Sequence, residues 1–114
     1  MPFAKVEGNN YIIYKDANMT IELKPVDNRK SFYGKCKVIY SPAGIQLQSY
    51  NTIVATWDGT QSIFIRQWDG YSATTMRHIN AFMRYLGFNL GGKAWWTSLP
   101  VGVPLTMHDI LNVG

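Results

Sequence analysis

Four strand-like segments joined by very short connections constrain the fold more than any other feature of this sequence. They cover residues 35–40, 44–49, 52–57 and 61–67. Alternating polar and apolar residues, or runs of β-branched and aromatic residues, are typical of strands. Connections this short can join only antiparallel neighbours, because a parallel pair needs a long crossover. The region therefore predicts an antiparallel β-meander of about four strands.

Two of these connections carry strong turn signals. The segment 41–44 has proline at the second turn position and glycine at the fourth. Asp58 followed by Gly59 is a short-range hairpin signal, because the turn that it favours needs positive φ. Both signals support the meander.

One α-helix is predicted after the meander, between Ser72 and Gly87. Ser72 can cap the free amides of the first turn, and Gly87 supplies the left-handed residue that ends many helices. Apolar residues recur between them at helical spacing and form one stripe, made by Met76, Ile79, Met83 and Leu86. Because an apolar stripe and a sheet face each need a partner, the helix is expected to pack across the meander.

The N-terminal segment, residues 1–30, holds two further strand patterns. Residues 11–14 are apolar and β-branched, and residues 19–24 alternate with period two. A plausible turn lies between them, so the sequence predicts an N-terminal β-hairpin.

The C-terminal segment, residues 88–114, is punctuated by glycine and proline and predicts an irregular tail. Residues 94–97 are interpreted as a short strand or a packed loop. Thr106 followed by Asp109 resembles a capping box, which predicts a turn or two of helix. The fold class is thus α+β, in a single domain over residues 1–114 with the meander and helix at 31–87.

The composition narrows the class of protein. Cys36 is the only cysteine, which excludes an internal disulfide and a four-cysteine zinc site. Strand alternation turns Cys36 inward beside Val38, so we expect an inert core thiol and a reducing compartment. No segment has the ~20 apolar residues of a membrane span, and no apolar run suggests a signal peptide. We expect a cytoplasmic protein without membrane contact.

Catalytic motifs are sparse. His78 and His108 are the only histidines, and neither lies in a nucleophile elbow or a histidine–glutamate metal motif. His108 is interpreted as a polar helix-end residue, and His78 as a half-buried neighbour of the apolar stripe. Gly91-Gly92-Lys93 lacks the spacing of a phosphate loop. We therefore expect no enzyme, no metal and no cofactor.

Binding residues can still be named. The formal charge is +4, and Arg29 and Lys30 lie in a basic stretch. Arg77, Asn80 and Arg84 recur at spacings of three and four, so they share the outward helix face and could hold phosphates or an acidic partner. Solvated surface is the alternative interpretation of that face.

A tryptophan pair completes the candidates. Trp95 and Trp96 could insert into a partner pocket or stack on bases. Adjacent residues of a strand face opposite ways, so one indole is expected in the core and the other exposed. An exposed indole would mark an interface, including that of a homodimer.

Three sequence segments, at residues 31–35, 49–52 and 71–80, resemble those of a known group of proteins. Together they resemble small proteins encoded by phages, plasmids and conjugative elements of Gram-positive bacteria, over roughly residues 31–87. The resemblance implies an accessory role on a mobile element, and proteins of that kind include inhibitors of host defence such as anti-CRISPR proteins.

From the resemblance and the missing catalytic motifs we expect a non-catalytic inhibitor. Its partner would be a host protein such as a CRISPR effector or another nucleic-acid-handling complex, and it would act by steric occlusion. The alternative is a small nucleic-acid-binding regulator of the mobile element.

Overall fold

The computed structural model describes residues 3–7, 10–14, 19–23 and 34–113. Strands β1 (Phe3–Glu7) and β2 (Asn10–Tyr14) form a separate two-stranded sheet. A six-stranded sheet contains β3 (Met19–Glu22), β4 (Cys36–Ser41), β5 (Gly44–Ser49), β6 (Thr52–Asp58), β7 (Ile63–Arg66) and β8 (Leu105–Thr106). The helices are α1 (Ala73–Tyr85), α2 (Lys93–Ser98) and α3 (Met107–Leu111). The predicted α+β class is confirmed.

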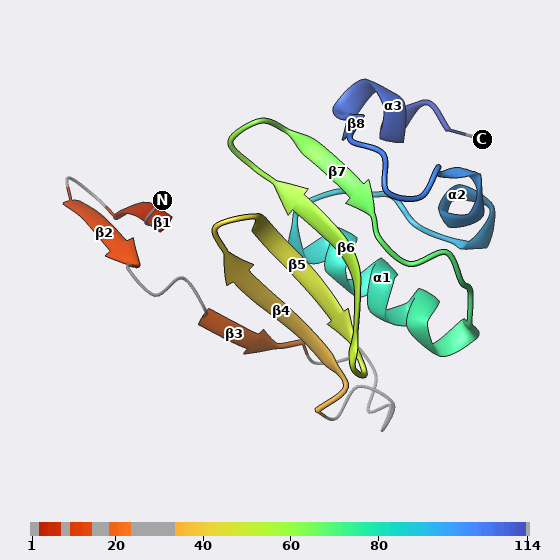
Figure 1. Ribbon diagram of the computed structural model, residues 1–114, viewed down its shortest axis with the longest axis horizontal. Coiled ribbons are helices and arrows are strands. Elements are labelled where there is room, and N and C mark those ends of the chain that lie inside the picture. Colours follow the sequence, from red (N-terminus) through yellow and green to blue (C-terminus); the bar gives the residue numbers. More distant parts are fainter. Residues whose placement is uncertain (1–2, 8–9, 15–18, 24–33, 114) are drawn as a thin grey trace.

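The six-stranded sheet is antiparallel throughout, with its strands in chain order from β3 to β8 (Figure 1). The four predicted strands form its centre as β4 to β7. Strand β3 adds to one edge, and β8 adds to the other after the chain has passed through α1 and α2. The meander is therefore confirmed, and it is wider than the local patterns indicated.

The pairing predicted for the N-terminal hairpin is wrong. Strand β2 pairs with β1, and β3 pairs with β4, so residues 11–14 and 19–24 do not face each other. In the register observed, Ile21 lies opposite Val38 on the face that carries the core, and Leu23 donates a backbone hydrogen bond to Cys36. Burial of Ile21 beside the core favours this pairing over a local hairpin. The hairpin of β1 and β2 stands apart from the larger sheet (Figure 1).

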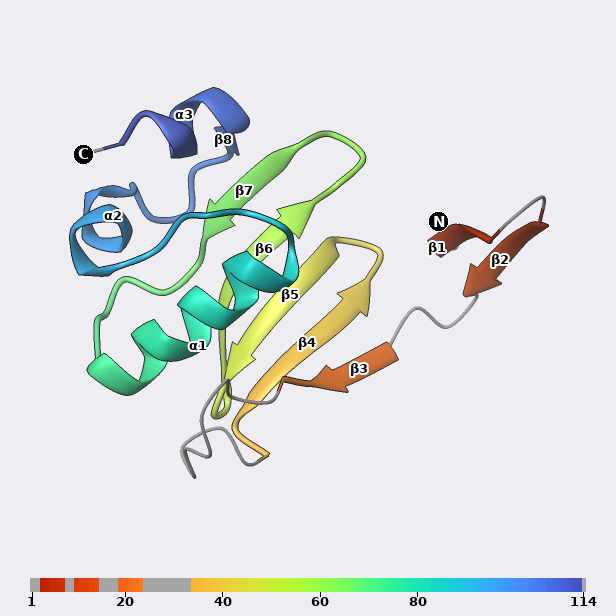
Figure 2. The same cartoon turned by 180° about the vertical axis from the view of Figure 1, so that it is seen from behind.

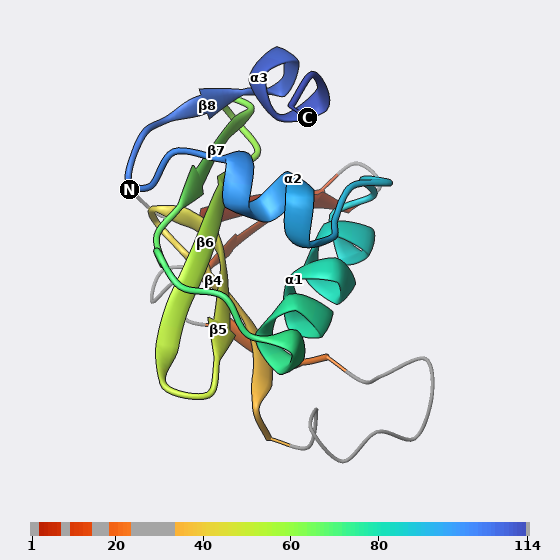
Figure 3. The same cartoon turned by 90° about the vertical axis from the view of Figure 1, so that its right-hand side faces the viewer.

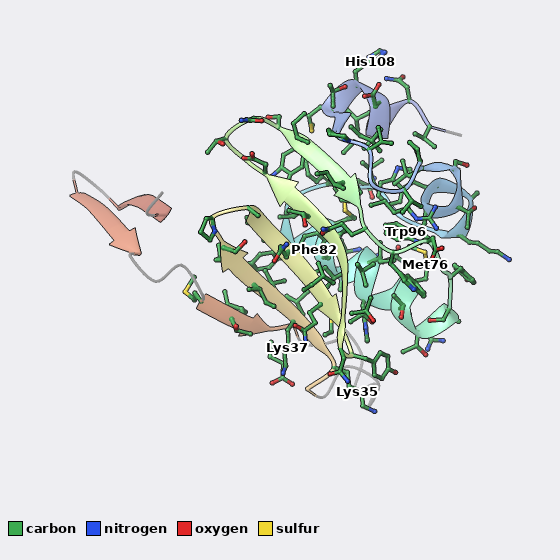
Figure 4. All side chains as sticks on the ribbon, in the orientation of Figure 1. Lys35, Lys37, Met76, Phe82, Trp96 and His108 are labelled. Atoms are coloured by element: carbon green, nitrogen blue, oxygen red, sulfur yellow. The ribbon has the colours of Figure 1, made fainter. Side chains whose placement is uncertain are left out.

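Helix α1 lies across one face of the sheet, as the amphipathic pattern predicts (Figures 2 and 3). The Ser72 side chain accepts a hydrogen bond of 3.0 Å from the Thr75 amide, and Gly87 follows the helix with φ of 92°. The buried side of α1 packs with the inner face of the sheet and α2 in one cluster, which includes Met76, Phe82 and Trp96 (Figure 4). Cys36 and Val38 are both fully buried, so the predicted inward orientation of Cys36 is confirmed.

A β-bulge shapes the centre of the sheet. Leu47 lies opposite Ala55 and Gln48 lies opposite Ile53, so Val54 is the extra residue on β6. A bulge lets two successive residues turn toward the same side. Val54 and Ala55 are both fully buried, as expected for two successive residues that turn toward the core.

The turn after β6 forms where Asp58-Gly59 predicts it, but with another geometry. Residues 59–62 connect the strands, and the positive φ occurs at Ser62 rather than at Gly59. The Asp58 carboxylate accepts hydrogen bonds from the Thr60 amide and hydroxyl, at 3.0 and 2.7 Å. These bonds lower the pKa of Asp58 and stabilise a longer loop than the two-residue turn.

The tail is more regular than predicted. Residues 94–97 belong to helix α2, which corrects their interpretation as a strand or loop. Thr106 and Asp109 form the predicted capping box, with bonds of 3.2 and 2.9 Å, and α3 follows it. The tail thus adds two short helices and an edge strand to the domain.

Candidate functional site

The outer side of α1 carries the two exposed arginines that the helical pattern predicts. Arg77 and Arg84 are exposed, whereas Met76, Ile79 and Met83 on the same helix are buried. Arg84 follows Arg77 by seven positions, which is about two helical turns. The two arginines therefore lie on one side of the helix, about 10 Å apart along its axis. The structure therefore brings together two of the predicted binding residues.

Asn80 lies between them in sequence but has a structural role. Its side-chain oxygen accepts a 3.0 Å hydrogen bond from the Gly92 amide, just before α2. Gly91 lies so close to this side chain that an added Cβ would collide with the amide oxygen. Asn80 thus fixes the connection between α1 and α2, which the spacing pattern did not reveal.

The prediction that one indole of the tryptophan pair is exposed is wrong. Trp95 and Trp96 have only 7% and 0% of their surface exposed. Their indole N–H groups donate to the backbone oxygens of Ile110, at 2.9 Å, and Gly70, at 3.0 Å. Helix α2 is covered on both sides, because α3 packs against Trp95 and the segment before α1 packs against Trp96. Neither ring is placed to stack on bases or to enter a partner pocket.

Arg66, which contributes to the formal charge, lies in the core. Its Nε donates to Trp68 at 2.8 Å, and Nη1 donates to the carbonyl oxygens of Trp96 and Leu99, both at 3.0 Å. In the described part of the chain, its hydrogen-bond acceptors are all backbone carbonyl oxygens. Burial lowers the pKa of Arg66, and nearby Asp69 opposes this shift. This cation holds the fold together and is not available to a partner.

A buried polar cluster joins α1 to the end of β5. The Ser49 hydroxyl lies 2.7 Å from His78 Nδ1 and 3.1 Å from the Thr75 hydroxyl. A serine–histidine contact is also the geometry of a nucleophilic pair. Here only 2% of Ser49 and 0% of His78 is exposed, so a substrate cannot reach either side chain. The sequence predicts a half-buried His78, whereas the structure buries it completely.

His108 and the basic pair Arg29 and Lys30 are the remaining candidates. His108 is exposed on α3, where it contacts the Asn112 amide at 3.2 Å (Figure 4). Arg29 and Lys30 lie outside the described residues. Among residues 3–7, 10–14, 19–23 and 34–113, no three histidine, cysteine or acidic side chains gather in a way that could hold a metal ion. None of the helices described is long and apolar enough to span a membrane.

The charges along the chain reveal a feature that the motif analysis missed. Residues 70–108 contain no aspartate or glutamate, and their basic residues are Arg77, Arg84 and Lys93, all exposed. The Lys93 ammonium lies 5.0 Å from the centre of the Tyr71 ring, a cation–π contact beside the start of α1. We call Arg77, Arg84 and Lys93 the cationic helical surface. A count of acidic residues by segment would have found it.

Comparison with protein families settles the relationship of this chain. The model of a family of unknown function (DUF8033) matches residues 21–98, which is more than half of the chain. The chain belongs to the DUF8033 family. The DUF8033 match runs from β3 to the end of α2, so it includes the meander, α1 and the tryptophan pair. A comparison with curated proteins and another with solved structures gave no match.

Proposed function

We propose that this DUF8033 protein is a non-catalytic binding protein that attaches to an acidic surface of a larger partner through the cationic helical surface. The observation that carries the proposal is the exposure of three basic side chains within a 70–108 segment that has no acidic residue. With no carboxylate in the same segment, these cations can attract an external anion.

The partner that fits best is a host defence protein that handles nucleic acid, with the chain acting as a mobile-element inhibitor. The family resemblance of residues 31–87 supports this context. A chain with formal charge +4 is repelled by the basic groove in which such a protein holds nucleic acid. It is attracted instead to an acidic region, such as the carboxylates that hold the metal ions of a nuclease. Covering that region would block access by steric occlusion.

The test is complex formation with a panel of host nucleases, including CRISPR effectors, measured by gel filtration. We expect one stable complex, and we expect Arg77→Gln combined with Arg84→Gln to weaken it at least tenfold. Lys35→Gln combined with Lys37→Gln removes the same net charge elsewhere and should leave binding within about twofold. Failure across the panel, or binding that survives the arginine changes, would count against the proposal.

The alternative function is direct nucleic-acid binding, which the same acid-free surface favours. The cationic helical surface offers two or three phosphate contacts. A plot of the logarithm of the DNA affinity against the logarithm of the salt concentration should therefore have a slope of about −2 to −3. The arginine variant should reduce that slope, whereas the lysine variant should not. Binding to DNA with this slope and no complex with any nuclease would favour the alternative.

A further inference from the structure

The sheet face opposite α1 has no covering element among the residues described. Figure 1 looks onto this face, and no labelled helix or strand crosses β4 to β7. Figure 3 shows α1 and α2 on the other side of the sheet. The pairing register places one row of side chains across it, in the order Thr20, Ile39, Gln46, Thr56 and Ile65, and the neighbours of Thr56 bury it to 5% exposed. We call this row, with the adjacent Gln48, Ile53 and Ile63, the open sheet face.

The apolar content of the open sheet face is high for a surface exposed to water. Four isoleucines stand on it, and each is half-buried by its neighbours without belonging to the core cluster: Ile39, Ile53, Ile63 and Ile65. On an antiparallel sheet with one solvated face, that face is usually polar. The β-branched side chains are stiff, so ordering them in an interface costs little entropy.

Three polar side chains of this face, Gln46, Gln48 and Thr56, make hydrogen bonds within the chain. Gln46 donates to the Thr56 hydroxyl at 3.2 Å, and that hydroxyl donates to the Gln67 side chain. Gln48 donates to the Tyr50 carbonyl oxygen at 2.9 Å. A partner surface could cover this face without breaking these three hydrogen bonds, which lowers part of the cost of desolvation.

The charges are arranged to permit contact between two copies of the chain. Among the described residues of this face, the charged side chains lie at the rim, where Glu22 lies opposite Lys37 and Asp58 lies at the end of β6. Helices α1 and α2, which carry Arg77, Arg84 and Lys93, lie on the other side of the sheet (Figure 3). Two copies with formal charge +4 would thus meet through uncharged centres, with Arg77, Arg84 and Lys93 pointing away from each other.

The size of the face is adequate for a weak dimer. Five strands of four to seven residues, spaced by about 4.8 Å and rising about 3.3 Å per residue, present on the order of 400 Å² in flat projection. Side-chain relief raises the accessible area toward the ~800 Å² that each partner contributes to a standard interface. An interface below this standard size fits a weak association, although buried area alone does not determine the dissociation constant.

We propose that the open sheet face binds the same face of a second copy, so that two sheets pack face to face in a two-fold dimer. Sheets packed in this way lie about 10 Å apart and interdigitate their side chains. A two-fold axis makes the contact self-complementary and closed. The dimer would present two cationic helical surfaces, one on each outer side. This inference does not depend on the function proposed for those surfaces.

The test is the mass in solution, measured by light scattering and sedimentation from about 5 µM to about 0.5 mM. The wild type is expected to approach about 26 kDa, twice the chain mass of 13.0 kDa. Ile39→Lys combined with Ile65→Lys should remain monomeric, and so should Ile39→Glu combined with Ile65→Glu. An equimolar mixture of the two variants should regain the dimer mass, because their faces carry opposite charges.

The mixture of the lysine and glutamate variants distinguishes loss of the interface from loss of the fold. Unfolded variants would not recombine into a dimer. The control is Arg77→Gln combined with Arg84→Gln, which should dimerise like the wild type. A wild type that stays monomeric up to about 0.5 mM overturns the proposal. Sheet-face variants that dimerise separately with unchanged affinity also overturn it.

Discussion

The guanidinium carbon of Arg66 lies 4.6 Å from the centre of the Trp96 ring, and the same guanidinium donates a 3.0 Å hydrogen bond to the Trp96 carbonyl oxygen. Arg66 belongs to β7, and Trp96 belongs to α2. The contact therefore ties the sheet to the helical layer through one buried cation. The indole N–H of Trp96 donates a hydrogen bond to the carbonyl oxygen of Gly70, in the segment that leads to α1.

Replacing Arg66 by lysine should destabilise the protein by about 2–4 kcal/mol. Lysine keeps the charge, but its single ammonium cannot reach the carbonyl oxygens that three guanidinium nitrogens contact. The free energy of unfolding in urea, followed by tryptophan fluorescence, measures the change. Arg77→Lys on the exposed side of α1 is the control and should stay within about 0.5 kcal/mol of the wild type. Equal stability of the two variants would contradict the structural role of Arg66.

Gly44→Ala should be more damaging than Gly87→Ala, although both glycines have positive φ, of 125° and 92°. A Cβ on Gly44 would lie 2.5 Å from the Trp57 carbonyl oxygen, whereas one on Gly87 meets no atom within 4 Å. We expect a loss of about 1 kcal/mol at Gly87 from backbone strain alone, and about 2–4 kcal/mol at Gly44 where a steric clash is added. Thermal unfolding of both variants checks the order, and a reversed order would exclude the clash.

Thr106→Ala should weaken the start of α3 by about 1 kcal/mol, because it removes one half of the capping box. A local readout is the NMR signal of the Trp95 indole N–H, which donates to Ile110 in α3 and should shift in the alanine variant. Thr106→Ser keeps the hydroxyl and should behave like the wild type. Loss of stability in the serine variant as large as in the alanine variant would contradict the capping role.

The second hydrogen bond of the capping box, from the Thr106 amide to the Asp109 carboxylate, depends on pH. Hydrogen bonds from the Thr106 amide and hydroxyl lower the pKa of Asp109, and nearby His108 adds to the shift. A carboxyl whose pKa is lower in the folded state stabilises that state above the unfolded pKa of about 3.9. The contribution is lost as the pH falls through the lower, folded pKa. The stability difference between the wild type and Asp109→Asn should therefore be constant near neutrality and shrink below about pH 4.

Local patterns predicted the parts of the fold that local contacts determine. The stripe from Met76 to Leu86 and the caps at Ser72 and Gly87 place α1 correctly, because caps and helical spacing act within a few residues. Strand alternation likewise identified β4 to β7. The pairing of β3 was missed because Ile21 gains its burial from β4, beyond the nearer β2.

The candidate site shows the same limit. Arg77 and Arg84 were predicted as exposed from the position of the apolar stripe, and they are. Trp95 and Trp96 were misjudged because the packing that covers α2 comes from α3 and Gly70, up to 26 residues away. Asn80 was misjudged because its acceptor role depends on Gly92. Contacts between residues this far apart in the sequence produce no periodic pattern, so periodicity does not predict them.

Cys36 should react slowly with thiol reagents in the folded protein, and its titration should affect stability in alkali. Burial raises the pKa of Cys36 to about 12, and the Glu22 carboxylate adds to the shift. A thiol whose pKa is raised by folding stabilises the folded state below the unfolded pKa of about 8.5 and loses this contribution as the pH rises toward the folded pKa. The stability advantage over Cys36→Ala should thus fall by about 1.4 kcal/mol for each pH unit above about 9. Urea unfolding of both proteins from about pH 7 to about pH 11 measures it. A constant difference, or rapid labelling of the native thiol, would show that Cys36 is accessible to solvent.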